Sequence, residues 1–116
     1  LKKKKLLGKY SAFTIAGAAI GVTNTKFKKW HSVFLDNLKA SIKLHNINKL
    51  IVINHRDCGA AKIVNGKKKF NKNNENNIHF ISFKRLKKII KIKLPKLKIE
   101  FCIMSLDGSI NKIHSL

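Results

Sequence analysis

The chain has 116 residues, of which 44% are hydrophobic, and it carries a formal net charge of +21. This length fits one domain with its own core, and the hydrophobic fraction excludes a disordered tail despite the charge. The chain begins with Leu1 and its only methionine is Met104, so we expect further residues upstream in the parent protein. Residues 1–116 are therefore expected to form a single incomplete domain.

The positive charge is almost entirely lysine, because Arg56 and Arg85 are the only arginines. Clustered positive charges can indicate a protein that binds nucleic acid or an anionic membrane. Recognition of phosphates and bases favours guanidinium groups, however, and lysine is enriched here together with asparagine and isoleucine. This combination indicates an AT-rich coding sequence and a solvated surface, which leaves a lysine-rich nucleic-acid-binding protein as the weaker alternative.

Cysteine content and hydropathy exclude two further classes of protein. Cys58 and Cys102 are the only cysteines, too few for a secreted disulfide scaffold, so the expected setting is the reducing cytoplasm. The longest apolar stretch, residues 12–22, is shorter than the ~20 residues of a membrane-spanning helix. Residues 2–5 are lysines and imitate the start of a signal peptide, but glycines interrupt the apolar stretch behind them.

The N-terminal half predicts a strand, a turn and a long helix. Residues 12–16 are typical of a short buried strand, and the small residues 17–21 predict a turn that lets the backbone approach a ligand. Residues 23–25 offer N-cap side chains for a helix that ends near Asn46. The apolar stripe of this helix, at spacings of three and four, consists of Phe27, Trp30, Phe34, Leu38 and Ile42.

A continuous apolar run, Leu50-Ile51-Val52-Ile53, follows this helix. A run without alternation is typical of a central parallel strand that is covered on both faces. The polar residues behind it therefore lie just beyond the carboxyl end of a buried strand, where open α/β sheets place their ligands. A short helix at residues 60–64 is expected next, with Gly66 as its C-cap.

The C-terminal half predicts a loop, a helix and a hairpin. Residues 67–77 are expected to form a polar loop, and the helical period that returns at Ile78 ends before Pro95. Residues 99–106 predict the last long strand, and Asp107-Gly108 predicts a hairpin turn. The expected fold class is α/β, with a mainly parallel β-sheet flanked by helices and a closing antiparallel hairpin.

One constellation, His55-Arg56-Asp57-Cys58-Gly59, carries chemistry. An imidazole and a thiolate separated by two residues can converge on one tetrahedral Zn²⁺, which accepts both nitrogen and sulfur. Cys58 would lie at the N-terminus of the following helix, where the helix dipole favours its thiolate form. Asp57 could cap that helix, and Gly59 lets the backbone pass close to the metal. The alternative is an inert buried Cys58 beside a hydrogen-bonded His55, and the position behind a buried strand favours the metal.

The stretch from Leu50 to Ala60 resembles the second zinc-ligand motif of the β-class carbonic anhydrases, a hydrophobic strand followed by His-x-x-Cys-Gly. Ala16-Gly17 is similar to the Ala-Gly turn before the long helix of that family, and residues 101–113 are similar to its closing strand and hairpin. Within the family, the closest similarity is to a branch that reads His-Arg-Asp-Cys-Gly-Ala and ends in a Leu-Asp-Gly hairpin. The resemblance covers essentially the whole chain outside the asparagine-rich loop.

This resemblance implies a zinc lyase that reversibly hydrates carbon dioxide to bicarbonate and assembles as a homodimer or higher homo-oligomer. It implies zinc held by two Cys and one His, with the fourth position open to water that becomes a nucleophile near neutral pH. Within this chain it assigns metal ligation to His55 and Cys58. It assigns a small substrate pocket to Gly17, Ala18 and Gly59.

The chain also departs from the family. The first ligand of the family lies in a Cys-x-Asp-x-Arg motif upstream of the Ala-Gly turn, and the Asp and Arg of that motif organise the open metal position. This chain lacks the motif, so no catalytic residue is assigned within it, and the Asp/Arg pair is expected upstream of Leu1. Cys102 is expected to be a small buried hydrophobe. The complete parent protein is thus expected to be the enzyme, and the 116-residue chain by itself is expected to be inactive. The alternative is a noncatalytic zinc-binding relative of the same fold. A sulfur analogue of carbon dioxide also stays open as the substrate.

Overall fold

The computed structural model describes residues 12–56, 58–114 and 116. The predictions for the lysine run at residues 2–5 and for Asp57 as a helix cap lie outside these residues. The described elements are α1 (Ala19–Thr23), η2 (Thr25–Phe27), α2 (Lys29–His45), β1 (Lys49–His55), α3 (Gly59–Asn65), α4 (Lys72–Lys93), β2 (Lys98–Met104) and β3 (Ile110–Ile113). None of these helices combines the length and the apolar character that crossing a membrane requires.

The described strands form one mixed sheet in the order β1-β2-β3. β1 and β2 are parallel, with Val52 opposite Phe101, whereas β2 and β3 are antiparallel, with Phe101 opposite Ile113. The turn before β3 contains Gly108 at a φ of 87°, and the predicted closing hairpin is confirmed. The α/β class is confirmed in this coarse sense, but the sheet described is mixed rather than mainly parallel.

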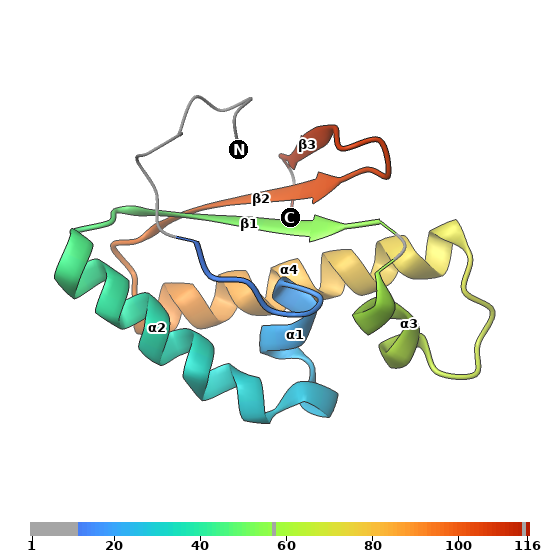
Figure 1. Ribbon diagram of the computed structural model, residues 1–116, viewed down its shortest axis with the longest axis horizontal. Coiled ribbons are helices and arrows are strands. Elements are labelled where there is room, and N and C mark those ends of the chain that lie inside the picture. Colours follow the sequence, from blue (N-terminus) through green and yellow to red (C-terminus); the bar gives the residue numbers. More distant parts are fainter. Residues whose placement is uncertain (1–11, 57, 115) are drawn as a thin grey trace.

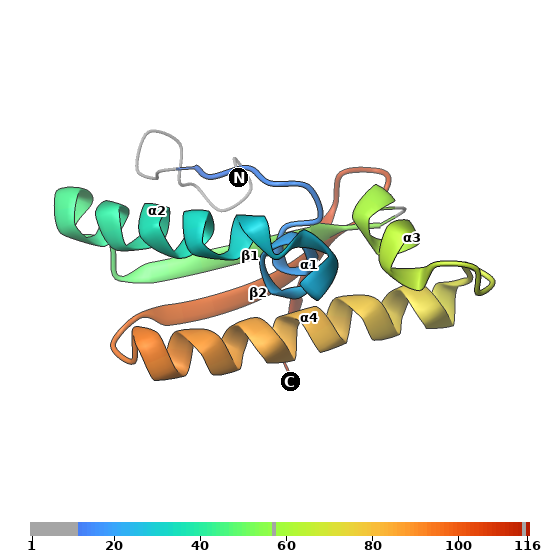
Figure 2. The same cartoon turned by 90° about the horizontal axis from the view of Figure 1, so that it is seen from below.

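The core lies between one face of the sheet and the helices. Figures 1 and 2 show α1, α2 and α4 on the same side of the sheet, with α2 and α4 running along the strands. The buried residues of this core include Phe34, Leu38, Val52, Phe83, Leu86, Ile90, Phe101 and Ile103. These three helices therefore cover one face of the sheet, and their buried side chains pack against those of β1 and β2.

The two long helices follow local signals in the sequence. α2 ends at Asn46, whose φ of 53° places it in the left-handed region that favours asparagine at a helix end, as predicted. α4 begins at Lys72, so the predicted loop is wrong for residues 72–77. The reason is an N-cap: the Asn71 side chain accepts a hydrogen bond from the Asn74 N–H, which stabilises an earlier start.

The segment before α2 differs from the prediction. Residues 12–15 form no strand, and residues 19–21, expected as the second part of a turn, belong to the helix α1, which extends to Thr23. In both views residues 12–15 run beside β1 and in the same direction, but a pocket separates them from it. A strand needs a neighbouring strand at hydrogen-bonding distance, which this separation prevents. The predicted strand at residues 12–16 is therefore wrong for the described structure.

Candidate functional site

The first predicted metal ligand, His55, is the last residue of β1 and is exposed. Its Nδ1 lies 3.0 Å from the backbone carbonyl oxygen of Arg56. A carbonyl oxygen only accepts, so Nδ1 donates this hydrogen bond, and Nε2 is the ring nitrogen that stays available to a metal. Histidines that bind metals commonly have their other ring nitrogen held in this way by a backbone carbonyl.

The second predicted ligand, Cys58, occupies the N-cap position of α3 and is 1% exposed. It belongs to a small apolar cluster with Ile20, Ala60 and Ala61. The two predicted ligands thus lie in different environments, one exposed and one buried. Within residues 12–56, 58–114 and 116, no group of three or more His, Cys, Asp or Glu side chains could hold a metal. A metal shared by His55 and Cys58 therefore stays a prediction.

The other cysteine, Cys102, lies within β2 opposite Ile53. It is 0% exposed, and its Sγ is 3.7 Å from Oε2 of Glu100. The prediction that Cys102 is a buried side chain of the final long strand is confirmed.

Two of the predicted pocket residues, Gly17 and Ala18, lie in a turn beside the start of α3, and the third, Gly59, is the first residue of α3. Gly17 lies so close to α3 that a Cβ atom added to it would be 2.5 Å from Cβ of Ala60, and its φ of +75° also favours glycine. Ala18 continues the turn at a φ of 45°. A Cβ atom on Gly59 would meet no other described residue within 4 Å, apart from its chain neighbours and helix backbone. The small-residue turn therefore packs against the helix that follows the predicted ligands, and space is open beside Gly59.

A buried polar network centred on Asn54 holds these parts together. Oδ1 of Asn54 accepts a hydrogen bond from the Ala19 N–H at 3.0 Å, and Nδ2 donates to His79 Nδ1 at 2.9 Å and to Ser82 Oγ at 3.3 Å. Asn54 is 1% exposed and directly precedes the first predicted ligand. One side chain thus fixes the end of β1, the start of α1 and the middle of α4 relative to one another.

A charged cluster lies beside this network on the first turns of α4. The Arg56 guanidinium donates a hydrogen bond to the Asn76 side chain, and its Nη1 is 3.7 Å from Oε1 of the buried Glu75. Oε2 of Glu75 is 3.6 Å from Nε2 of His79. These contacts attach Arg56, between the predicted ligands in the chain, to α4.

Burial lowers the pKa of His79 below its ordinary value of 6.5. The nearby Glu75 carboxylate acts in the opposite direction, and the charges of Arg56 and His55 add to the lowering. Because Nδ1 of the neutral ring accepts from Asn54, its proton is on Nε2, which faces Glu75. His79 is therefore held as a neutral imidazole inside the protein.

This burial predicts a pH dependence of stability. In the unfolded chain His79 takes up a proton near pH 6.5, whereas in the folded protein it does so only at lower pH, so acid favours unfolding. We expect the free energy of unfolding to fall as the pH drops below about 6.5, by at most ~1.4 kcal/mol per pH unit from this group. Urea unfolding at a series of pH values measures this slope. His79→Gln should flatten it and the exposed-site control His114→Gln should not; equal slopes in both variants would contradict the assignment.

Sequence reasoning missed this network, although a signal for it was present. Asn54 continues the inward-facing positions Leu50 and Val52 of β1, where a polar side chain needs a buried partner. Glu75, His79 and Ser82 recur at spacings of four and three on α4. Polar residues at the spacing of a buried helix face could have indicated partners for Asn54.

No family model and no solved structure matches this chain. An uncharacterized protein of Rickettsia conorii is 31% identical over 117 residues, and an uncharacterized protein of Rickettsia bellii is 31% identical over 115 residues. The chain belongs to this Rickettsia family. The alignments cover 100% and 98% of this chain, which spans 63% of the R. conorii relative and 70% of the R. bellii relative.

Proposed function

We propose that this chain is part of a zinc protein of the β-class carbonic anhydrase kind, which in its complete form reversibly hydrates carbon dioxide to bicarbonate. One observation carries the proposal. His55 is the last residue of β1, which pairs in parallel with β2, and Cys58 follows it as the N-cap of α3, against which the Gly17-Ala18 turn packs. The carboxyl ends of parallel strands are where open α/β sheets bind ligands. The carbonic anhydrase fold and a homodimer, which the sequence resemblance implies, belong to the same proposal.

The donor groups support zinc as the metal. Zn²⁺ accepts imidazole nitrogen and thiolate sulfur, and the Nδ1 hydrogen bond of His55 leaves Nε2 able to bind. His55 and Cys58 would hold half of a tetrahedral site. We propose that a third protein ligand comes from outside the 116 residues and that the fourth position is open, as in catalytic zinc sites.

Zinc, when bound, supplies the Lewis acidity that makes water a nucleophile toward carbon dioxide near neutral pH. The residues of this chain position the site. Asn54 holds the end of β1 against α1 and α4, and the contacts of Arg56 with Asn76 and Glu75 tie the connection between the ligands to α4. No described residue lies within 4 Å of a Cβ atom built on Gly59, apart from its chain neighbours and helix backbone, so a small substrate has room beside it.

The proposal is tested by comparing the 116-residue chain with the complete natural chain that contains it. We expect the complete chain to bind about one zinc ion and to hydrate carbon dioxide in stopped-flow assays. The 116-residue chain should bind zinc roughly 100-fold more weakly or worse, because losing even an outer-shell partner costs about 10- to 100-fold.

The other outcomes separate the alternatives. Zinc without carbon dioxide hydration in the complete chain would favour the noncatalytic zinc-binding relative. Absence of zinc together with salt-dependent binding to DNA would favour the nucleic-acid-binding protein. Strong hydration activity in the 116-residue chain alone would show that the site has been assigned incorrectly.

A further inference from the structure

The solvent side of α4 carries a concentration of positive charge. Residues 76–99 contain eight lysine or arginine residues and no aspartate or glutamate. Phe83, Leu86 and Ile90 are buried and turn one side of this helix toward the core. Figure 2 shows α4 along one long border of the molecule, so the other side of the helix faces solvent.

Two apolar side chains lie among these charges. Exposed residues at spacings of three and four form one stripe along the solvent side of α4, which we call the cationic face: Ile81, Lys84, Arg85, Lys88, Lys91 and Ile92. Ile81 is 48% exposed and Ile92 is 71% exposed. Across the described part of the chain, no ion pair involves a cation of this face. The cationic face therefore offers positive charge and apolar surface to the same partner.

The other long helix, α2, has a different distribution of charge. Its exposed lysines, Lys29, Lys39 and Lys43, are spread along the helix, and the exposed Asp36 lies between them. A lysine-rich composition accounts for scattered charges of this kind on a solvated surface. It does not account for the cationic face of α4, where cations gather without an acidic residue and beside exposed isoleucines.

We propose that the cationic face of α4 binds the surface of an anionic phospholipid membrane. The negative headgroups of the lipids complement the four cations, and each lysine or arginine near such a surface strengthens binding about fivefold. The boundary between headgroups and acyl chains accepts apolar side chains, so Ile81 and Ile92 become buried there. In this arrangement the protein lies on the surface of the membrane.

Nucleic acid fits the same face less well. A phosphate backbone would neutralise the cations, but phosphates offer no apolar surface to Ile81 and Ile92. Arg85 is the only arginine of the face, although guanidinium groups are the ones that suit bidentate recognition of phosphates. A membrane thus contacts every side chain of the cationic face, whereas nucleic acid contacts the charged ones alone.

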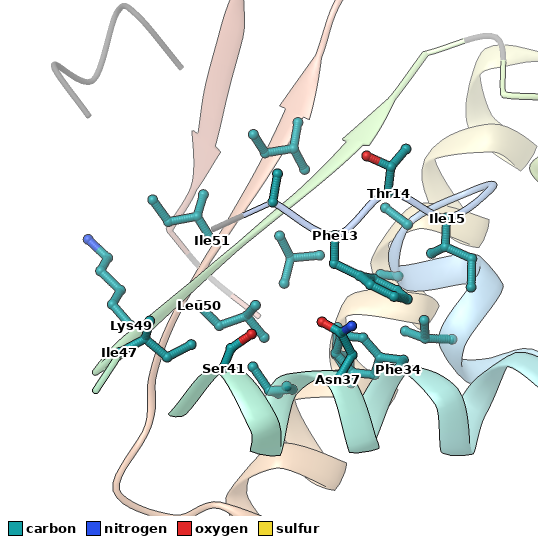
Figure 3. Close-up of a pocket in the computed structure, with 18 of the residues that line it drawn as sticks. Phe13, Thr14, Ile15, Phe34, Asn37, Ser41, Ile47, Lys49, Leu50 and Ile51 are labelled. Carbon is teal, nitrogen blue, oxygen red and sulfur yellow. The ribbon is translucent and has the colours of Figure 1, made fainter. Parts of the chain in front are cut away.

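The cationic face is separate from the proposed zinc site and from the pocket beside β1. Arg56, which follows the first predicted ligand, contacts Glu75 and Asn76 in the first turns of α4, whereas the cationic face begins at Ile81 and continues toward the C-terminal end of the helix. The pocket, whose lining Figure 3 shows, includes only the buried Leu86 from α4. Membrane binding therefore leaves both places open and does not depend on the zinc function.

Sedimentation of the complete natural chain with lipid vesicles tests the proposal. Vesicles of phosphatidylcholine with about 30% phosphatidylserine should bind the protein, pure phosphatidylcholine vesicles should not, and salt should weaken the binding. Lys84→Gln, Lys88→Gln and Lys91→Gln together should weaken it about 100-fold, given about fivefold for each charge. The same three lysines replaced by arginine keep their charge and should bind as before. Equal binding to both kinds of vesicle, or binding to neither, would overturn the proposal.

A matched triple variant on α2 locates the binding surface. Lys29→Gln, Lys39→Gln and Lys43→Gln remove the same charge from exposed positions of another helix. We expect this variant to lose less than about threefold in vesicle affinity, because exposed charges more than ~10 Å from the headgroups are largely screened. Equal losses in the two glutamine variants would mean attraction by net charge alone and would overturn the assignment to α4.

Ile81→Gln together with Ile92→Gln distinguishes a membrane from nucleic acid. Both positions are exposed and glutamine is a good helix former, so this variant keeps the fold and all the cations. Its affinity for the anionic vesicles should fall about 10-fold, because the apolar area buried at the headgroup boundary is lost. Unchanged vesicle binding would overturn the proposal. Salt-dependent binding of the natural chain to a DNA duplex, without binding to the anionic vesicles, would assign the face to nucleic acid and also overturn it.

Discussion

We expect Cys58→Ser to abolish zinc binding to the complete protein and Cys102→Ser to leave it intact. A serine hydroxyl stays neutral near pH 7 and is a poor replacement for the thiolate that binds zinc. The two cysteines form a matched pair, because they are 1% and 0% exposed, so both substitutions disturb a buried position. A difference in zinc content between the two variants therefore shows the loss of a zinc ligand and not the disturbance of a buried position.

Metal analysis after dialysis measures this difference as zinc per chain. We expect about one zinc ion in the Cys102→Ser protein and almost none in the Cys58→Ser protein, with each variant losing only about 1 kcal/mol of metal-free stability. Urea unfolding in EDTA supplies that second quantity. Full zinc occupancy in the Cys58→Ser protein would refute Cys58 as a ligand.

We expect Asn54→Leu to lower the free energy of unfolding by about 3 kcal/mol or more. The substitution removes the partners of the Ala19 N–H and of His79 Nδ1, and each buried polar group left without a hydrogen bond costs about 1–3 kcal/mol. Leucine keeps a similar side-chain size, so lost hydrogen bonds rather than a cavity dominate the effect.

Asn77→Leu is the control for this substitution. Asn77 lies exposed on α4, and its replacement should change the free energy of unfolding by no more than about 0.5 kcal/mol. Urea midpoints and slopes of both variants of the 116-residue chain give the comparison. A loss below about 1 kcal/mol in the Asn54→Leu protein would mean that the network contributes little to holding β1, α1 and α4 together.

Signals confined to short stretches of sequence predicted much of the fold. The spacing of Phe34 and Leu38 identified the buried face of α2, and Asn46 marked the end of that helix. Pro95 follows the end of α4, and Asp107-Gly108 forms the predicted hairpin turn. These features were predictable because helix periodicity, caps and turns depend on residues that are near one another in the chain.

The candidate site was predictable in part. The His55-to-Gly59 motif and the Gly17-Ala18 turn could be selected from residue type and from their positions relative to the apolar run. Their packing could not: the approach of Gly17 to Ala60 joins segments far apart in the chain, and so does the Asn54–His79 hydrogen bond, across 25 residues.

The sequence by itself determined the helix faces, the hairpin and the apolar character of β1. Only the tertiary structure decided that β1 lies at the edge of the described sheet, that residues 12–15 stand apart from it, and that His55 is exposed while Cys58 is buried. An apolar run has the same composition whether its edges are paired or free. Which edge is paired depends on the arrangement of distant segments around a shared core, because strand partners are chosen by packing across the whole chain.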